Sequence, residues 1–446
     1  MKKFLKITAV ILLSLLIFFV GTFKYRQYKA SQILIPKNTT TLIKISVDEM
    51  YKSLALNMIT HPGFYLKPDL KKDSLSKTNK FDHGLKIPSS IYLYTIQDQP
   101  TTALFSRLII DDFNKFELFI KNTLKLQLSK KDGLNHGKSK LGNLAVLYNA
   151  DNAAIVFSNE AGKYVATLTE ILNQKNQIQL EKSKFKYISQ STDHIAFYNI
   201  KNNASINFEK GLLKFENDFV SETIVPQKKT THRKFDNQSV MNMWFNADFV
   251  STSNKTHRLK NISLDSDSLT KYYNGYMDFE WTGTTHQLDS IITYEYNDDF
   301  EKVEKITLQK REIPNLVMSI DATAGLQNYL SRQNVINLDS GTINKSVFPL
   351  YKLFVSEADK KLILSTKKAA DLNSNFISSN IFFGLNINFK PLNKQASFPF
   401  FKPYFKSFKH LNVVGKATSN NKIRIEGTLT FVNENINTLY QILKVM

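Results

Sequence analysis

The chain has 446 residues, and 59 basic against 39 acidic residues give it a formal net charge of +20. Hydrophobic residues make up 42% and charged residues 22%, a globular composition that excludes disordered tails and fibrous proteins. The chain contains no cysteine, which excludes disulfide frameworks, thiolate metal sites, iron–sulfur clusters and cysteine nucleophiles.

The N-terminal residues have the pattern of a membrane anchor. Residues 7–23 carry no charge, and Lys6 and Lys24 flank them. A helix of this length spans roughly 26 Å at about 1.5 Å per residue, and the lysine stems extend it towards both interfaces. A cleaved signal peptide is the alternative, but Phe19 and Tyr28 stand where small residues are needed. We therefore expect residues 1–30 to form a single-pass anchor, with the rest of the chain on the periplasmic side of the cell membrane.

Beyond the anchor, one pattern occurs twice. Residues 35–47 and 313–320 both begin with Ile-Pro and continue as a strand, and Asp48 and Asp321 follow as the natural N-caps of two helices. A second repeat follows each first one, because residues 148–158 match 355–365 in spacing. Helical patterns then cover residues 159–173 and 366–372.

These repeats predict two related lobes, one over residues 31–310 and a shorter one over residues 311–446. Chance similarity between common strand-turn-strand patterns is the alternative explanation. Hairpins are expected over residues 90–110, before a helix capped by Asp111, and over residues 411–431, before a C-terminal helix. The predicted fold class is α+β, with two lobes of antiparallel sheet and packed helices.

This layout resembles uncharacterised, membrane-anchored bacterial envelope proteins of the "domain of unknown function" type. The resemblance covers the anchor and the repeated strand, turn and helix patterns of both lobes. It implies a cell-envelope location and supplies no catalytic residues to carry over.

The sequence contains no complete cofactor-binding or metal-binding motif. The string from Gly133 to Ser139 is one residue short of a phosphate-binding loop and is interpreted as a polar turn. The eight histidines show no ligand spacing, and the stretch beginning at Asp265 lacks the glycine and glutamate of a calcium loop, which leaves capping near Ser268 as its interpretation. We predict no cofactor and no metal, and no motif for binding nucleic acid is present.

Asp278 and Glu280 are the best candidates for a catalytic carboxylate pair. They lie two residues apart in a strand pattern, which places them on one face about 7 Å apart, a glycosidase-like distance. Because Met277, Phe279 and Trp281 alternate with them, we interpret their face as the solvent-exposed one. A hydrolase that uses these carboxylates is kept as the alternative function.

Residues 398–410 are rich in aromatic and basic side chains. Their spacing predicts a basic amphipathic helix that begins near Pro403. Such a helix suits an anionic membrane surface or an apolar ligand, whereas a core-facing helix with a solvated lysine face is the plainer interpretation. The candidate contact residues on its two faces are Phe401, Phe405 and Phe408, and Lys402, Lys406 and Lys409.

Together these patterns favour a non-catalytic, membrane-anchored envelope protein. Its expected partners are the membrane, through residues 7–23, and an envelope lipid, glycan or protein, with anionic lipid suggested by the basic charge. Binding of nucleic acid is not expected.

Overall fold

The computed structural model describes residues 2–66, 82–131, 133–250, 256–259, 262–358, 360–369, 375–394, 405–418 and 421–445. Contacts within the chain define two compact units. Unit 1 comprises Met1–Lys210 with Asn435–Tyr440, and unit 2 comprises Gly211–Glu434 with Gln441–Met446. This division differs from the predicted boundary at residues 310 and 311, which falls inside one continuous strand, β19 (Lys302–Ala322).

Unit 1 is built around an antiparallel sheet. In spatial order its strands are β11 (Asn202–Phe208), β10 (Ile195–Asn199), β2 (Thr39–Ile45), β3 (Ile91–Ile96), β4 (Leu104–Ile109), β8 (Asn152–Phe157), β7 (Leu144–Tyr148), β6 (Leu134–Lys138) and β5 (Gln127–Lys131). A separate pair joins β1 (Leu34–Pro36) to β9 (Gln177–Gln179). The string predicted to be a polar turn near Gly133 instead forms β6, so that prediction is wrong.

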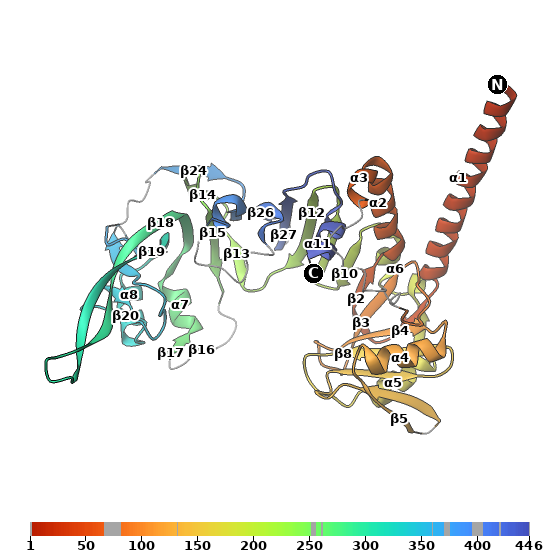
Figure 1. Cartoon of the computed structure of the whole chain (residues 1–446), viewed down its shortest axis with the longest axis horizontal. Helices are drawn as coiled ribbons and strands as arrows, with labels where there is room; N and C mark the ends of the chain where they lie inside the picture. The colour runs from red at the N-terminus through yellow and green to blue at the C-terminus, as the bar shows by residue number, and fades with distance from the viewer. Residues whose placement is uncertain are drawn as a thin grey trace. The chain divides into compact units, whose positions relative to one another are not determined.

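Helices complete unit 1, and Figure 1 shows α1 as its long N-terminal helix. They are α1 (Lys2–Ser31), α2 (Val47–Thr60), α3 (Pro62–Tyr65), α4 (Phe113–Asn122), α5 (Val165–Leu172), the short η1 (Leu180–Lys182) and α6 (Lys186–Gln190). The largest core cluster includes Leu42, Tyr94 and Phe105, which are 0–2% exposed. Burial of these side chains supplies the main stabilisation of the unit.

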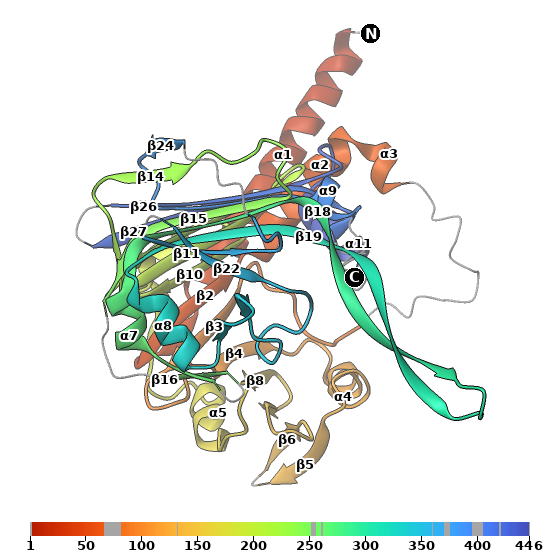
Figure 2. The same ribbon diagram turned by 90° about the vertical axis from the view of Figure 1, so that its left-hand side faces the viewer.

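Unit 2 contains the second large antiparallel sheet, whose strands β15, β18, β19 and β26 run side by side in Figure 2. In spatial order this sheet comprises β12 (Leu212–Val220), β27 (Lys422–Phe431), β26 (Phe408–Ala417), β25 (Phe383–Asn388), β15 (Met241–Phe249), β18 (Tyr273–Tyr296), β19, β23 (Lys361–Ser365) and β22 (Phe354–Ala358). The predicted hairpin over residues 411–431 is confirmed as β26 and β27.

The remaining elements of unit 2 are short. Strand β13 (Ile224–Pro226) pairs with β15, and β21 (Thr342–Ile343) joins β20 (Ile336–Asn337) to β22. The others are β14 (Thr230–Arg233), β16 (Thr256–Leu259), β17 (Ile262–Asp265), α7 (Ser266–Tyr272), α8 (Gly325–Arg332), β24 (Phe376–Ser379) and α9 (Phe389–Leu392). Helix α11 (Thr438–Val445) has residues in both units. Strands β14 and β24 pair only with each other, as a two-stranded ribbon, in the described part of the chain. Mixed α+β architecture with mostly antiparallel sheet is thus confirmed.

Strands β18 and β19 continue past their neighbours as a two-stranded arm, visible in both overall views (Figures 1 and 2). Their register shifts between Trp281 and Thr284, at a bulge where Gly283 has φ +132°. This positive φ favours glycine. Residues 285–310 beyond the bulge pair only with each other among the described residues.

The expected membrane anchor falls on α1. The structure does not describe the side chains of most of residues 7–23. In the portion of the chain that the structure describes, no helix is both long enough and apolar enough to cross a membrane. The anchor stays a prediction.

The structure confirms one of the predicted aspartate caps and differs from the other three. Helix α2 begins after Ser46, and Asp48 lies in its first turn and accepts hydrogen bonds from Arg26 at 2.9 Å. Asp321 belongs to β19 because that strand continues to Ala322. The α4 cap is Asp112, one residue later than predicted. Capping near Ser268 is confirmed, because the Asp265 carboxylate accepts from the Ser268 amide at 2.8 Å.

The second sequence repeat forms a hairpin in each unit, but the two turns differ. Tyr148 pairs with Ala153 in β7–β8, whereas Ala358 pairs with Lys361 in β22–β23, which places the second turn two residues later in the matched sequences. Residues 366–369 are bends and not the predicted helix, whose remaining residues lie outside the description. The proposed duplication stays a prediction.

Candidate functional site

Strand β15 gives the sheet of unit 2 one polar face and one apolar face. Asn242, Trp244 and Asn246 alternate with Met241 and other apolar residues along this strand. Successive side chains of a strand point to opposite faces, and directly paired residues of neighbouring strands share a face. The register therefore determines which side chains gather on each face.

Three asparagines form a ladder across the polar face. Asn242 pairs with Asn386 on β25, which pairs with Asn412 on β26. The Asn386 amide donates to Asn242 Oδ1 at 2.9 Å, and the Asn412 amide donates to Asn386 Oδ1 at 2.5 Å. The ladder leaves the Asn242 NH2 group and the Asn412 carbonyl oxygen without partners among the described residues, so a donor and an acceptor are available at its two ends.

An aromatic group stands beside the ladder. The His232 ring stacks on Trp244 with centroids 4.3 Å apart, and Phe235 lies 5.8 Å from the same indole. His232 Nδ1 donates to the Arg233 carbonyl oxygen at 2.9 Å, which fixes the orientation of the imidazole. The Trp244 indole N–H is buried and has no hydrogen-bond partner among the described residues.

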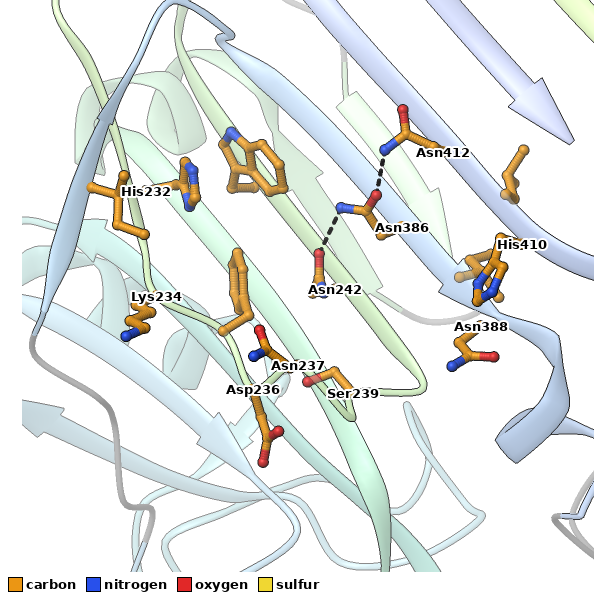
Figure 3. Close-up of a pocket in the computed structure, with 15 residues that line it drawn as sticks. His232, Lys234, Asp236, Asn237, Ser239, Asn242, Asn386, Asn388, His410 and Asn412 are labelled. Carbon is orange, nitrogen blue, oxygen red and sulfur yellow. Dashed lines mark hydrogen bonds between the residues drawn. The ribbon is translucent and has the colours of Figure 1, made fainter. Parts of the chain in front are cut away.

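The ladder and the aromatic group line one cavity of about 520 Å³, shown in Figure 3. This volume lies within the range of small-ligand pockets, roughly 300–1,000 Å³. Its floor comes from β15, β25 and β26, and one wall comes from residues 232–239. The lining residues are His232, Lys234, Phe235, Asp236, Asn237, Ser239, Asn242, Trp244, Ile377, Asn386, Ile387, Asn388, His410, Leu411 and Asn412.

A buried ionic network fixes that wall to the sheet. The Arg233 guanidinium donates to Asp278 Oδ1 and to Glu280 Oε2, each at 2.8 Å. Asp278 also accepts from the Tyr276 hydroxyl at 2.9 Å, and Glu280 Oε1 accepts from the Ser239 hydroxyl at 2.6 Å. The remaining donors to this group are the Arg233 Nε–H and the Asp236 backbone N–H.

Two carboxylates share a single guanidinium here, and all three groups are buried, with exposures of 4% for Arg233, 0% for Asp278 and 6% for Glu280. Burial acts to lower the pKa of Arg233, but its hydrogen bond to Asp278 and the two negative charges outweigh burial and raise the pKa. Burial and the Asp278 charge likewise raise the pKa of Tyr276, so its hydroxyl remains a donor at neutral pH.

The predicted solvent-exposed face is therefore wrong for Asp278 and Glu280. The period of two was interpreted correctly, because Met277, Phe279 and Trp281 share the opposite face. The segment that carries Arg233 covers the polar face. Because Arg233 lies 45 residues before Asp278 in the sequence, the strand pattern around Asp278 does not reveal this contact. Neither carboxylate lines the cavity, whose one carboxylate among the described lining residues is Asp236.

The predicted aromatic-lysine site is assembled differently from the expectation. Phe401 and Lys402 lie outside the described residues. Phe408 and Lys409 begin strand β26, so the helix predicted to contain them is wrong there. Phe405 and Phe408 pack on Phe389, with ring centroids 5.4 and 5.3 Å apart.

The two described lysines of this segment face solvent. Lys406 is exposed, and Lys409 pairs with Glu434 at 2.6 Å. The packing of the phenylalanines agrees with the plainer, core-facing interpretation of the segment. Contact of these residues with a membrane or a ligand stays a prediction.

Sequence reasoning missed the asparagine ladder. Asn242, Asn386 and Asn412 are separated by 144 and 26 residues along the chain, and only the strand register brings them together. The alternation of Asn386 and Asn388 with apolar residues was the available signal, but a single strand does not reveal which other strands lie beside it.

Comparisons with known proteins provide no family. No family model matches the chain, and no curated protein matches it in sequence. Among solved structures, crystal form I of TP0453 is 9% identical, with a TM-score of 0.28 over 46% of this chain and 90% of that one. Crystal form IV of TP0453 is 10% identical, with a TM-score of 0.24 over 78% and 94% of the two chains. Likenesses this low carry no inference about function.

Proposed function

We propose that the protein is a non-catalytic binding protein of the cell envelope, and that the polar cavity of unit 2 binds neutral sugar residues of an envelope glycan. The observation that carries this proposal is the meeting of an asparagine ladder with an aromatic group in one cavity of about 520 Å³.

The chemistry of the lining suits a sugar. A carboxamide donates and accepts at once, as vicinal hydroxyls do, so the two free ends of the ladder complement a polyhydroxylated ring. An aromatic face packs against the apolar C–H face of such a ring. The lining contains one lysine and one acidic residue, Lys234 and Asp236, whose charges offset each other and favour a neutral ligand.

The cell-envelope location is part of the proposal. Two observations support this location: residues 7–23 are uncharged and lie between lysines, and the chain contains no cysteine. We propose that residues 7–23 hold the chain in the cell membrane with the remainder on the periplasmic side. Protease treatment of spheroplasts is expected to digest the large C-terminal part of the chain, and its protection in intact spheroplasts would reverse the assigned side.

A hydrolase that uses Asp278 and Glu280 is the second candidate. Burial of the pair is the observation that favours it, since a catalytic carboxylate is commonly desolvated. Binding without catalysis is preferred because Arg233, Tyr276 and Ser239 already engage the carboxylate oxygens. A general acid needs a proton to donate and an open path to the substrate.

Isothermal titration calorimetry of the full-length chain tests the binding function. The probes are neutral oligosaccharides, including the tetramer of N-acetylglucosamine. We expect saturable binding of at least one probe and no cleavage products. Asn386→Leu removes the central rung of the ladder, so Asn242 and Asn412 lose the hydrogen bonds that orient their free groups, and binding is expected to weaken roughly tenfold.

Asn274→Ala is the matched control, because Asn274 is exposed and lies outside the cavity. Its affinity is expected to equal that of the unaltered chain. Equal weakening by both substitutions, or no binding of any probe, would contradict the proposal. Release of shortened oligosaccharides would favour the hydrolase.

A further inference from the structure

Helix α2 of unit 1 buries polar side chains and exposes apolar ones. Its buried residues are Glu49 and Asn57, and Ser53 lies half-buried between them. Residues four apart are neighbours on a helix, so these three form one polar stripe. A surface helix of a globular protein ordinarily shows the reverse arrangement. The exposed large apolar residues over residues 47–66 are Tyr51, Leu56, Met58, Ile59, Phe64 and Leu66.

Hydrogen bonds hold the polar stripe against the rest of unit 1. The Asn57 carboxamide donates to the Asn435 carbonyl oxygen at 3.0 Å and accepts from the Asn437 backbone amide at 2.7 Å. The Ser53 hydroxyl accepts from the Asn437 carboxamide at 2.8 Å. A rotation of α2 that buried its apolar side would break these bonds, so the exposure of that side is built into the fold.

Helix α1 lies beside α2 and runs antiparallel to it. Arg26 donates to the Asp48 carboxylate at 2.9 Å, and Lys52 Nζ lies 5.4 Å from the centre of the Phe23 ring. The contacts therefore move towards the N-terminus of α1 as they advance along α2. At about 1.5 Å per residue, Ile59 lies roughly 10 Å beyond Lys52 along the α2 axis. The end of α2, with α3, thus extends in the same direction as the N-terminal part of α1 (Figure 1).

The exposed side chains of α1 change in character at these contacts. Ile17 and Val20 are exposed apolar residues on the N-terminal side, whereas Lys24, Tyr25 and Tyr28 are exposed on the C-terminal side. Tyrosine and lysine are typical of the level at which a helix leaves a membrane. The last turns of α2 therefore lie at the level of the apolar part of α1.

We propose that residues 47–66, the α2–α3 corner, rest in the lipid interface of the membrane that holds α1. The exposed apolar side chains enter the acyl boundary, as in interfacial helices, and Lys52 keeps its ammonium among the headgroups. A lipid surface is favoured over a second copy of the chain because the exposed apolar part of α1 extends beside the corner. The inference rests on the proposed membrane location of residues 7–23 and is independent of the sugar site.

Single-cysteine variants of the full-length chain test this contact, since the chain has no cysteine of its own. Ile59→Cys reports the corner, Ile17→Cys the anchor, and Leu141→Cys is the matched control, because Leu141 is 77% exposed against 75% for Ile59. Each is labelled with nitrobenzoxadiazole and reconstituted into vesicles of phosphatidylcholine and phosphatidylglycerol that contain a nitroxide-labelled lipid. We expect the nitroxide to quench the probes at positions 59 and 17 and to leave the probe at position 141 unquenched.

A double variant tests whether the apolar side chains hold the corner in the lipid. In the Ile59→Cys chain, Leu56→Ser with Phe64→Ser is expected to shift the equilibrium between the inserted and the free corner roughly tenfold towards the free one. The shift is measured as lost quenching at position 59. The matched control is Ile109→Ser with Phe157→Ser, which removes two exposed apolar side chains of unit 1 outside the corner and is expected to leave the quenching unchanged.

The probes separate failure of this inference from failure of the membrane location. Quenching at position 17 without quenching at position 59 would overturn the inference and leave the location standing. No quenching at either position would overturn both. Blue-shifted emission at position 59 that the nitroxide lipid does not quench would mean that protein, such as a second copy, covers the corner. Equal quenching of all three probes would show partition of the fluorophore alone. Either of these last results would overturn the inference.

Discussion

Within the described residues, Arg233 is the one cation paired with the buried Asp278 and Glu280, so its removal leaves both carboxylates charged and uncompensated. We predict that Arg233→Met lowers the free energy of unfolding by about 3–5 kcal/mol. Denaturant unfolding followed by tryptophan fluorescence measures this loss, since both tryptophans lie in unit 2.

Two further variants serve as controls for Arg233. Arg424→Met removes a guanidinium that is 36% exposed and paired with Glu216, Asp218 and Glu426, and exposed pairs contribute only about 0–1 kcal/mol each. The triple variant Arg233→Met, Asp278→Asn, Glu280→Gln removes the buried charges together and is expected to recover much of the lost stability. Equal losses for Arg233→Met and Arg424→Met would contradict the buried network.

Asp321 provides a prediction with a defined dependence on pH. Burial raises its pKa above the ordinary value of 3.8, Lys361 opposes this effect at 4.0 Å, and the Asp278 charge adds to it. A carboxyl whose folded-state pKa is raised stabilises the fold below its unfolded pKa, and this stability is lost as pH rises through the folded-state pKa.

We therefore predict that Asp321→Asn has a higher melting temperature than the unaltered chain at pH 7. The difference should vanish below about pH 4, where the aspartate is protonated in both states. Thermal unfolding at several pH values measures it. A lower melting temperature for the variant at pH 7 would show that the ion pair with Lys361 outweighs the cost of burial.

At the scale of elements, the arm formed by β18 and β19 is an exposed two-stranded ribbon of unit 2. Side chains on one of its faces include Ile292, Ile306 and Leu308, which are 54%, 71% and 66% exposed. A two-stranded ribbon is marginally stable without packing on one face. The backbone amide hydrogens of the arm can therefore exchange with solvent after local opening, without unfolding of the whole unit.

We predict that amide hydrogens of residues 288–308 exchange with solvent much faster than those of β15, β25 and β26. Hydrogen–deuterium exchange with mass spectrometry of the full-length chain measures this contrast. Slow exchange along the arm at all protein concentrations would mean that its apolar face is covered, and slow exchange only at high concentration would indicate self-association through the arm.

The sequence predicted the types of these elements better than it predicted where they end and which strands they pair with. The 411–431 hairpin follows from alternation and its turn residues, and the helix after the first strand follows from hydrophobic period, although it begins at Val47 and is not capped by Asp48 as predicted. Asp321 was predicted to begin a helix because aspartate is a common N-cap residue and follows a strand pattern. In the structure, Asp321 pairs with Lys361 of β23, so β19 continues beyond it. Likewise, the spacing of Phe405 and Phe408 fits a helix, but Phe408 pairs with Phe431 of β27 and is therefore part of strand β26.

At the scale of the whole molecule, the sites depend on long-range register. Alternation in β15 and β18 predicts two faces, but it does not reveal that Arg233 covers one of them or that three asparagines align across strands. The division between units depends in the same way on which strands pair. The asparagine ladder and Trp281 lie on opposite faces of one sheet because Asn242 pairs with Glu280, and Met241 with Trp281, on the paired strands β15 and β18.

The measurement that tests the central claim most directly is a fluorescence titration of two single-tryptophan chains with one neutral oligosaccharide that binds in calorimetry. The Trp281→Phe chain, which keeps Trp244 in the polar cavity, is expected to show a saturable change at the calorimetric affinity. The Trp244→Phe chain is expected to show none. A response from Trp281 alone, or from neither tryptophan despite binding, would contradict the assignment of the sugar site to the asparagine face of unit 2.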